Sequence, residues 1–167
     1  MDEIEIVPYD ARWPALYEAE RMRLLPVLDR FGLIEMAHIG STAVPGLAGK
    51  PAIDIAITVV SLDAVREHGV PKIEALGYLF WAENPDSDDL FFVKGLPPNT
   101  DRRTHHLHVT LPGARFNERL RFRDKLRADA GLAQRYAVLK RELAARFSSD
   151  REVYTRAKTA FIVAVLG

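Results

Sequence analysis

The fold of this chain is decided by one stretch, His38-Ile39-Gly40-Ser41-Thr42-Ala43-Val44-Pro45-Gly46-Leu47-Ala48-Gly49-Lys50-Pro51-Ala52-Ile53-Asp54-Ile55. A Gly-Ser turn opens it, a glycine-rich loop ending in Lys50 follows, and an apolar strand then carries Asp54. Glycines let a backbone approach an anion closely, while successive N–H groups and a lysine can face its oxygens. A carboxylate further along can hold a divalent metal. This order of residues predicts a phosphate-handling site.

The composition bounds what the chain can be. Its 167 residues are 48% apolar and include no cysteine. That length predicts one domain with a proper core, and the lack of cysteine excludes disulfides, thiolate metal sites and a cysteine nucleophile. No apolar run reaches membrane-spanning length, and the N-terminus is acidic rather than signal-like. We therefore expect a soluble, cytoplasmic protein with no membrane partner.

The net charge of zero is unevenly distributed. Residues 115–167 contain 13 Lys and Arg against 6 Asp and Glu, a charge of +7, so the first 114 residues carry −7. This division fits an anion-facing helical region beside an acidic core, although ordinary solvated helix faces would give the same count. Non-specific nucleic-acid binding through the basic half is a weaker alternative.

The hydrophobic pattern predicts a mixed sheet followed by helices. Residues 52–60 are almost wholly apolar and β-branched, which is typical of a central strand buried on both faces. Further strands are expected over 33–39, 78–81, 90–93 and 104–111, and helices after Asp10, over 62–76, from Asn117 to Ala128, around Tyr136 and from Ser149. Asp10, Asn117 and Ser149 are the expected caps. The prediction is an α/β (α+β) domain over 1–167, with a mixed-sheet core over 1–114 and a helical part over 115–167.

Two strands carry side chains that are costly in a core. Asp54 needs a partner if it is buried, and His106 and His108 lie on one face of their strand because side chains alternate. Together these three residues form a carboxylate and imidazole set that suits Mn, Zn or Fe more than Mg. They are the predicted catalytic residues and metal ligands. The alternative is a buried Asp–His hydrogen bond that neutralises two costly groups.

The helices contribute lysines. Tyr136 with Lys140, and Tyr154 with Lys158, each lie one turn apart. A lysine on an apolar helix face either extends past the edge of the core or reaches an anion in a cleft. Arg103, before the histidine strand, is a further candidate phosphate ligand, with a solvated loop as the alternative. No Walker A loop fits, because Pro51 follows Gly49-Lys50, and no Gly-x-Ser-x-Gly elbow is present.

The stretch 38–55 closely resembles the signature of the GrpB family. Nearly the whole chain shares in the resemblance, which includes residues 8–14, the strand 105–109, residues 122–124 and the two Tyr/Lys pairs. The family is similar to the nucleotidyltransferase superfold, in which a Gly-Ser turn holds nucleotide phosphates and carboxylates bind two metal ions. GrpB-like domains also occur fused to dephospho-coenzyme A kinase, which implies nucleotide or coenzyme A chemistry.

The resemblance assigns the phosphate turn to Gly40 and Ser41 and the first carboxylate to Asp54. The second carboxylate position is Ala56, and the third is expected near His106 and His108, so the two-metal set is incomplete. We expect a nucleotidyltransferase-fold enzyme acting on a small phosphorylated ligand or nucleotide, with one divalent metal (Mn, Zn or Mg). A non-catalytic ligand-binding or partner-regulating module is the alternative, and no oligomeric state is predicted. The expected ligand-binding residues are His38, Gly40, Ser41, Thr42, Lys50, Arg103, Lys140, Tyr154 and Lys158.

Overall fold

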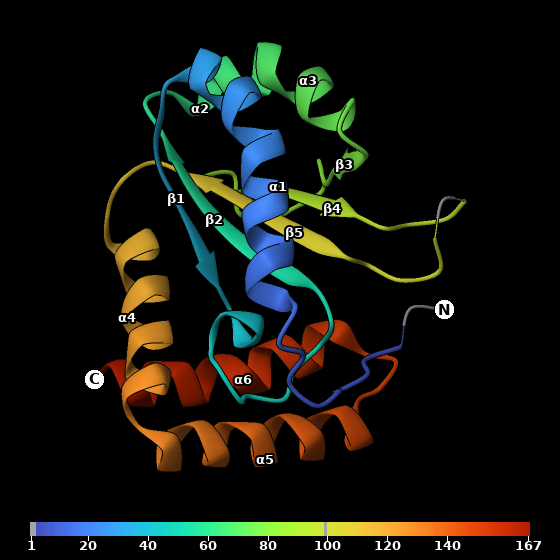
Figure 1. The fold of residues 1–167 in the computed structure, drawn as a ribbon, viewed down its shortest axis with the longest axis vertical. Helices are drawn as coiled ribbons and strands as arrows, with labels where there is room; N and C mark the ends of the chain where they lie inside the picture. Colours follow the sequence, from blue (N-terminus) through green and yellow to red (C-terminus); the bar gives the residue numbers. More distant parts are fainter. Residues whose placement is uncertain (1–2, 99) are drawn as a thin grey trace.

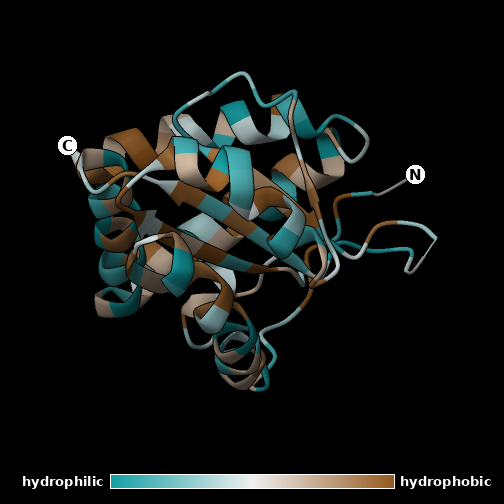
Figure 2. Cartoon of the chain, turned by 90° about the horizontal axis from the view of Figure 1, so that it is seen from above, coloured by the Kyte–Doolittle hydropathy of each residue, from teal (hydrophilic) through white to brown (hydrophobic). Residues whose placement is uncertain are grey.

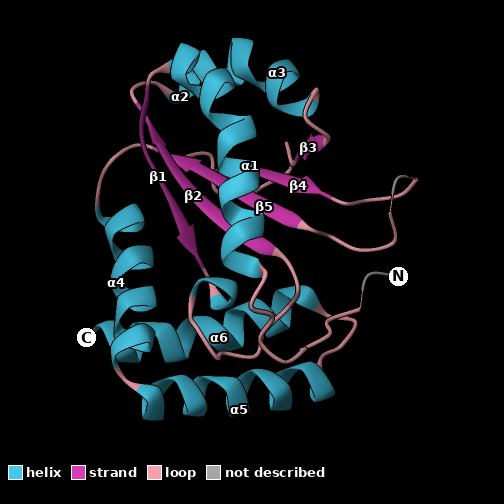
Figure 3. Ribbon diagram, in the orientation of Figure 1, coloured by secondary structure: helices cyan, strands magenta, loops and turns pink. Residues whose placement is uncertain are grey.

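A computed structural model describes residues 3–98 and 100–167, and it is built on one five-stranded sheet (Figures 1 and 3). The strand order is β1-β2-β5-β4-β3, and only the β2/β5 pair is parallel. The strands are β1 (Leu33–Ile39), β2 (Ile53–Val59), β3 (Tyr78–Phe80), β4 (Leu90–Lys94) and β5 (His105–Thr110). The mixed α/β fold predicted from the sequence is confirmed.

The strand β2 lies inside the sheet because its apolar, β-branched residues can be buried on both faces. It pairs with β1 on one side and with β5 on the other. The register of the parallel pair places Asp54 beside His106 and Ala56 beside His108. The sequence prediction of a central strand is therefore correct, and its register decides which polar side chains meet.

One face of the sheet is covered by α1 (Trp13–Leu28) and by the helical segment α2 (Leu62–Ala64), a π-helical turn (Val65–Gly69) and α3 (Val70–Glu74). In Figure 1, α1 crosses in front of the strands. Leu24 and Leu28 of α1 pack in one core cluster with Ile55 and Ile57 of β2 and Leu107 of β5. Figure 2 shows hydrophobic colour along the strands and alternating colours on the helices. Alternation along β2 sends Asp54 and Ala56 to the opposite face.

Three helices follow the sheet: α4 (Ala114–Ala128), α5 (Ala130–Arg146) and α6 (Arg151–Leu166). Phe116 of α4 packs with Ile39 and Ala56 on the second face of the sheet. Figure 1 shows α5 and α6 below the sheet, beneath the loop that joins β1 to β2. Helices α5 and α6 therefore lie below the end of β1 and the start of β2.

Within the described residues, no helix has the length and hydrophobicity needed to cross a membrane.

The helix starts differ from the predicted caps. Helix α1 begins after Arg12, and Asp10 instead accepts hydrogen bonds from the backbone and side chain of Arg12. Helix α4 begins after Gly113 rather than at Asn117, and the cap of α6 is Asp150 rather than Ser149. The Asp150 side chain accepts from the Val153 N–H at 3.0 Å. Ser149, Asp150 and Glu152 all fit a helix start, so the pattern located the helix to within one residue.

Candidate functional site

The loop between β1 and β2 is packed too closely for side chains at two of its glycines. Gly40 has φ +73°, and a Cβ there would lie 2.5 Å from Asp54 Oδ2. A Cβ on Gly49 would lie 2.5 Å from the Cβ of Ser41. Both distances are far below van der Waals contact, so only glycine fits. The loop thus holds Ser41 close to the start of β2.

Asp54 and His106 form a hydrogen-bonded pair on the second face of the sheet, with His106 Nδ1 2.9 Å from Asp54 Oδ1. Burial raises the pKa of the Asp54 carboxyl, but the hydrogen bond and charge of His106 and the charge of Lys50 bring it well below its usual value. Burial lowers the pKa of His106 by more than Asp54 raises it. An ionised carboxylate therefore faces a neutral imidazole, whose Nδ1 donates the proton.

A second Asp–His pair lies beside the first. His108 Nδ1 is 3.1 Å from Asp89 Oδ2, and Arg119 of α4 donates to the same carboxylate oxygen at 2.5 Å. Burial raises the pKa of Asp89, yet the hydrogen bond and charge of His108, with Arg119, bring it down to about 2. Because Arg119 neutralises Asp89, this second pair carries its own counterion.

Lys140 of α5 is buried directly under the glycine-rich loop. Its ammonium donates to Ser41 Oγ at 2.6 Å and to the carbonyl oxygen of Ala48, and it lies 4.7 Å from the ring centroid of Tyr136. Burial, followed by the charges of Lys158 and Lys50, lowers the pKa of Lys140 to about 7. No ion pair joins it to a carboxylate in the described part of the chain. The amine is thus held in place without charge compensation.

Lys158 of α6 is a second lysine that lines the same cavity as Lys140. Its Nζ lies 4.7 Å from the ring centroid of Tyr154, and Nζ of Lys50 lies 5.5 Å from the same ring. Burial and the charge of Lys50 lower the pKa of Lys158 to about 7. Burial also raises the pKa of Tyr154 to about 12, so its phenol stays protonated. The amines of Lys50 and Lys158 therefore both lie near the Tyr154 ring and repel each other.

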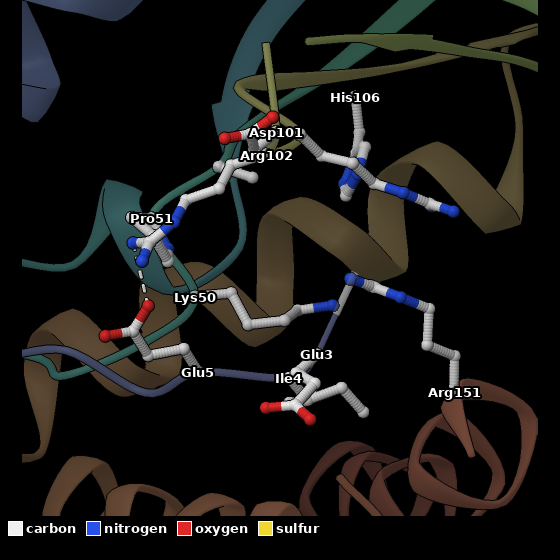
Figure 4. A pocket seen from close by; sticks show the side chains of 11 residues that line it. Glu3, Ile4, Glu5, Lys50, Pro51, Asp101, Arg102, His106 and Arg151 are labelled. Carbon is white, nitrogen blue, oxygen red and sulfur yellow. Dashed lines mark ion pairs between the residues drawn. The ribbon is translucent and has the colours of Figure 1, made fainter. Parts of the chain in front are cut away.

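These groups line one cavity of about 470 Å³. Sequence-predicted residues on its wall are Gly40, Ser41, Lys50, Asp54, Arg103, His106, His108, Lys140, Tyr154 and Lys158. A second cavity of about 610 Å³ adjoins it and shares Lys50, Arg103, His106 and Arg151 with it (Figure 4). Most residues chosen from the sequence are therefore brought together, although they come from five separate segments.

Two predicted ligand-binding residues are placed elsewhere. His38 Nε2 lies 2.8 Å from Thr42 Oγ1, and the His38 ring stacks on Tyr17 with 4.7 Å between centroids. Both His38 and Thr42 are buried, and neither lines the cavity. Burial lowers the pKa of His38 to about 4, so the ring is neutral. The structure places them behind the turn, with the His38 ring directed toward α1, and their contact with a ligand stays an untested prediction.

The predicted metal ligands do not converge. His106 and His108 each turn Nδ1 to a different carboxylate, Asp54 and Asp89. Within residues 3–98 and 100–167, no three His, Asp or Glu side chains are grouped so that they could hold a metal ion. Ala56 also stands where the sequence resemblance predicts a second carboxylate. The residues present do not fit the two-metal set, and the single predicted metal at Asp54, His106 and His108 remains an untested prediction.

Sequence reasoning missed several residues of the site. Neither Asp89 nor Arg119 is among the candidate site residues predicted from the sequence. The strand order provides the missing signal, because Asp89 immediately precedes β4, the neighbour of β5. Arg151 and Phe91 also line the cavity. No local pattern distinguishes Arg119 or Arg151 from other surface arginines.

A family profile and two sequence relatives each match nearly the whole chain. The sequence profile of the GrpB family, described as GrpB protein, matches residues 3–167. A UPF0157 protein of Pseudomonas aeruginosa is 44% identical over 99% of this chain and 67% of its own length. A UPF0157 protein of Bacillus subtilis is 38% identical over 96% of this chain but only 45% of its own length. The chain thus spans between about half and two thirds of these relatives.

Solved structures agree with the sequence comparison. Conserved protein GrpB from Enterococcus faecalis aligns with a TM-score of 0.83 and 31% identity, covering 96% of this chain and 94% of that one. The Cid1 poly(U) polymerase aligns with a TM-score of 0.57 at 14% identity, over 84% of this chain and 45% of that one. That second likeness concerns the fold alone. On the profile match and these relatives, the chain belongs to the GrpB family.

Proposed function

We propose that the cavity binds a phosphate-bearing nucleotide or coenzyme-like ligand, with a phosphate against Ser41, Lys140 and Lys158. The observation that carries the proposal is that these two lysines line the same cavity and that neither forms an ion pair with a carboxylate of the described residues. Uncompensated ammonium groups in a partly dehydrated cavity are costly. A bound anion would remove that cost.

The charge balance of the cavity supports an anionic ligand. Its wall carries Lys50, Arg103, Lys140, Arg151 and Lys158. The carboxylates that line the same cavity already have partners: Asp54 has His106, Asp86 has Arg115 at 2.6 Å, and Asp89 has Arg119. The described lining thus contains five basic side chains and three carboxylates, an excess of basic groups that favours an anionic ligand.

The identity of the ligand beyond its phosphate rests on shape and relatives. Phe91, which is partly exposed, gives the cavity a flat aromatic surface on which a base could stack. A dephospho-CoA kinase of Mycolicibacterium paratuberculosis contains a segment 30% identical to this chain, over 43% of its length. The Cid1 structure was obtained with MgATP bound. These features favour a nucleotide or a coenzyme precursor.

Transfer of a nucleotidyl or phosphoryl group is the activity that this fold supports. The alternative is a non-catalytic binding or partner-regulating module that kept the phosphate pocket, which Ala56 favours because it removes one metal-binding carboxylate. Both versions share the same phosphate contacts. They differ in turnover: cleavage of a bound nucleotide that stops in Asp54→Ala would exclude the binding module.

Isothermal titration calorimetry with adenosine, AMP, ATP, pyrophosphate and dephospho-coenzyme A tests the proposal. We expect the phosphorylated compounds to bind and adenosine to bind far more weakly. The double variant Lys140→Met/Lys158→Met should lose binding, while Lys72→Met, which removes an exposed lysine of α3, should keep it. Equal binding of adenosine and AMP, or full binding by the double variant, would overturn the proposal.

A further inference from the structure

The two Asp–His pairs of the sheet differ in what surrounds them. Asp89 is shared between His108 and Arg119, and Arg119 also approaches His108 Nδ1 at 3.4 Å. Asp54 accepts its hydrogen bond from His106, and the groups that lower its pKa are His106, Lys50 and His108 rather than an arginine. Asp54 can therefore respond to a positive charge that develops on its histidine, whereas Asp89 is already committed to an arginine.

His106 has one ring nitrogen engaged and one unengaged. Because the Asp54 carboxylate is an acceptor, Nδ1 is the nitrogen that donates to it, and Nε2 is the ring nitrogen left for another partner. The His106 side chain is only 8% exposed, and Nε2 has no hydrogen-bond partner within the described residues. A buried nitrogen without a partner is costly, so it indicates a group that meets a ligand.

The position of His106 determines which ligand group it meets. His106 lines both cavities, at the wall they share with Lys50 and Arg151 (Figure 4). Lys140 and Lys158 line the smaller of these cavities together with His106. A phosphate held by the two lysines would therefore share that cavity with the imidazole, whose reaction would be with the phosphorus, the electrophilic atom.

We propose that His106 is a nucleophile that accepts a phosphoryl group on Nε2. The Nε2–P bond forms as the P–O bond to the leaving group breaks, and the leaving oxygen keeps the electron pair and takes a proton from water. The Nδ1 proton remains on the ring, so the phosphorylated imidazole is a cation paired with the Asp54 carboxylate. A water or acceptor hydroxyl then attacks the same phosphorus and releases Nε2.

This assignment explains why the metal-binding carboxylates of the superfold are absent. In the two-metal arrangement, metal ions neutralise the transferred phosphate and activate the attacking group. Here lysines and arginines would neutralise the phosphate, and a histidine would replace the activated oxygen nucleophile. Asp54 changes from a metal ligand to a positioning residue for His106. The inference rests on the proposed phosphate site, because the cations must first hold the phosphorus beside Nε2.

Phosphoramidate is the probe, because it transfers a phosphoryl group by breaking its P–N bond and releasing ammonia, without a protein partner. The folded full chain is incubated with it at neutral pH, and the site of modification is mapped by mass spectrometry that preserves P–N bonds. We expect one phosphoryl group on His106, stable in alkali and lost in mild acid. Its rate should exceed that of the other four histidines and of the urea-unfolded chain by about tenfold or more, because the donor is bound beside Nε2.

Matched variants separate a catalytic role from general reactivity. His106→Asn should lose the modification, and His68→Asn, which changes an exposed histidine, should keep it. Asp54→Asn should slow modification of His106 by about tenfold or more, because an amide cannot stabilise the imidazolium. Circular dichroism verifies that each variant is folded, and the mapping in the unaltered chain stands even if a variant is not.

Modification of His106 no faster than in the unfolded chain, or faster modification of another histidine, would overturn the inference. Titration with AMP is done on the same samples. If AMP binds but His106 is not modified, the proposed phosphate site stands and the nucleophile is refuted. If AMP does not bind either, the proposed function fails as well.

Discussion

Replacing Lys140 with methionine removes the buried amine beside Ser41 while keeping the length of the side chain. The pKa of Lys140 falls from 10.5 to about 7, which corresponds to about 5 kcal/mol against the charged form. At pH 8, roughly nine tenths of the Lys140 amines are therefore neutral in the empty protein. Binding of an anion must bring a proton with it.

The size of this effect follows from Coulomb's law. A unit charge 4 Å from the amine contributes about 4 kcal/mol at an effective dielectric constant of 20, which offsets most of the cost of charging Lys140. Lys158, whose pKa is also about 7, should respond in the same way. Sulfate binding at pH 8 should therefore take up about two protons. Lys140→Met should reduce the number of protons taken up to about one, and it should weaken sulfate binding about 10- to 100-fold.

The assay is calorimetric titration with sulfate at pH 8 in two buffers that differ in ionisation enthalpy. Sulfate does not titrate in this range, so any dependence of the heat on buffer reports protons taken up by the protein. Affinity should also fall as the pH rises from 7 to 9. The reasoning is refuted if the heat is independent of buffer, or if Lys140→Met takes up as many protons as the unaltered chain and Lys72→Met.

Three further predictions concern stability, measured by urea unfolding. Between pH 7 and 9 the unfolded chain binds more protons at Lys140 than the folded chain, so the free energy of unfolding should rise with pH, and less steeply in Lys140→Met; parallel curves would contradict this. Gly49→Ala should lower the free energy of unfolding by about 1–3 kcal/mol, because the new Cβ would overlap Ser41. Unchanged stability would argue against the close approach of Gly49 and Ser41. Glu20→Ala should lower the free energy of unfolding by about 3–5 kcal/mol, since Lys94 and Tyr78 donate to the buried Glu20 carboxylate at 2.8 and 2.7 Å. A loss below about 1 kcal/mol would contradict that account.

The fold could be predicted from sequence where the residue pattern is periodic. The apolar run 52–60 identifies β2 as a central strand, and the alternation after Thr104 places His106 and His108 on one face of β5. The helix caps were less certain, because several polar residues near each start can cap a helix equally well. Neither the strand order nor the parallel β2/β5 pairing follows from local pattern, since both depend on contacts distant in sequence.

The site was predicted in part for the same reason. Gly40, Ser41 and Asp54 lie within one short stretch, and its residue types in sequence already predict a phosphate-handling site. The role of Lys140 depends on α5 passing beneath the loop, which only the folded structure reveals. His38 stands two residues before the turn, yet its ring contacts Thr42 and Tyr17 and does not line the cavity. Nearness in sequence was a weaker guide than the face of the strand.

The most direct test of the central claim is the anomalous diffraction of a crystal soaked in tungstate, an oxyanion of phosphate-like shape. The account predicts a tungsten peak in the cavity at hydrogen-bonding reach of Ser41 Oγ and of Nζ of Lys140 and Lys158. Competition with AMP should remove the peak. Tungstate bound only at other surfaces, with the cavity empty in crystals that leave it open, would contradict the claim that these lysines form a phosphate site.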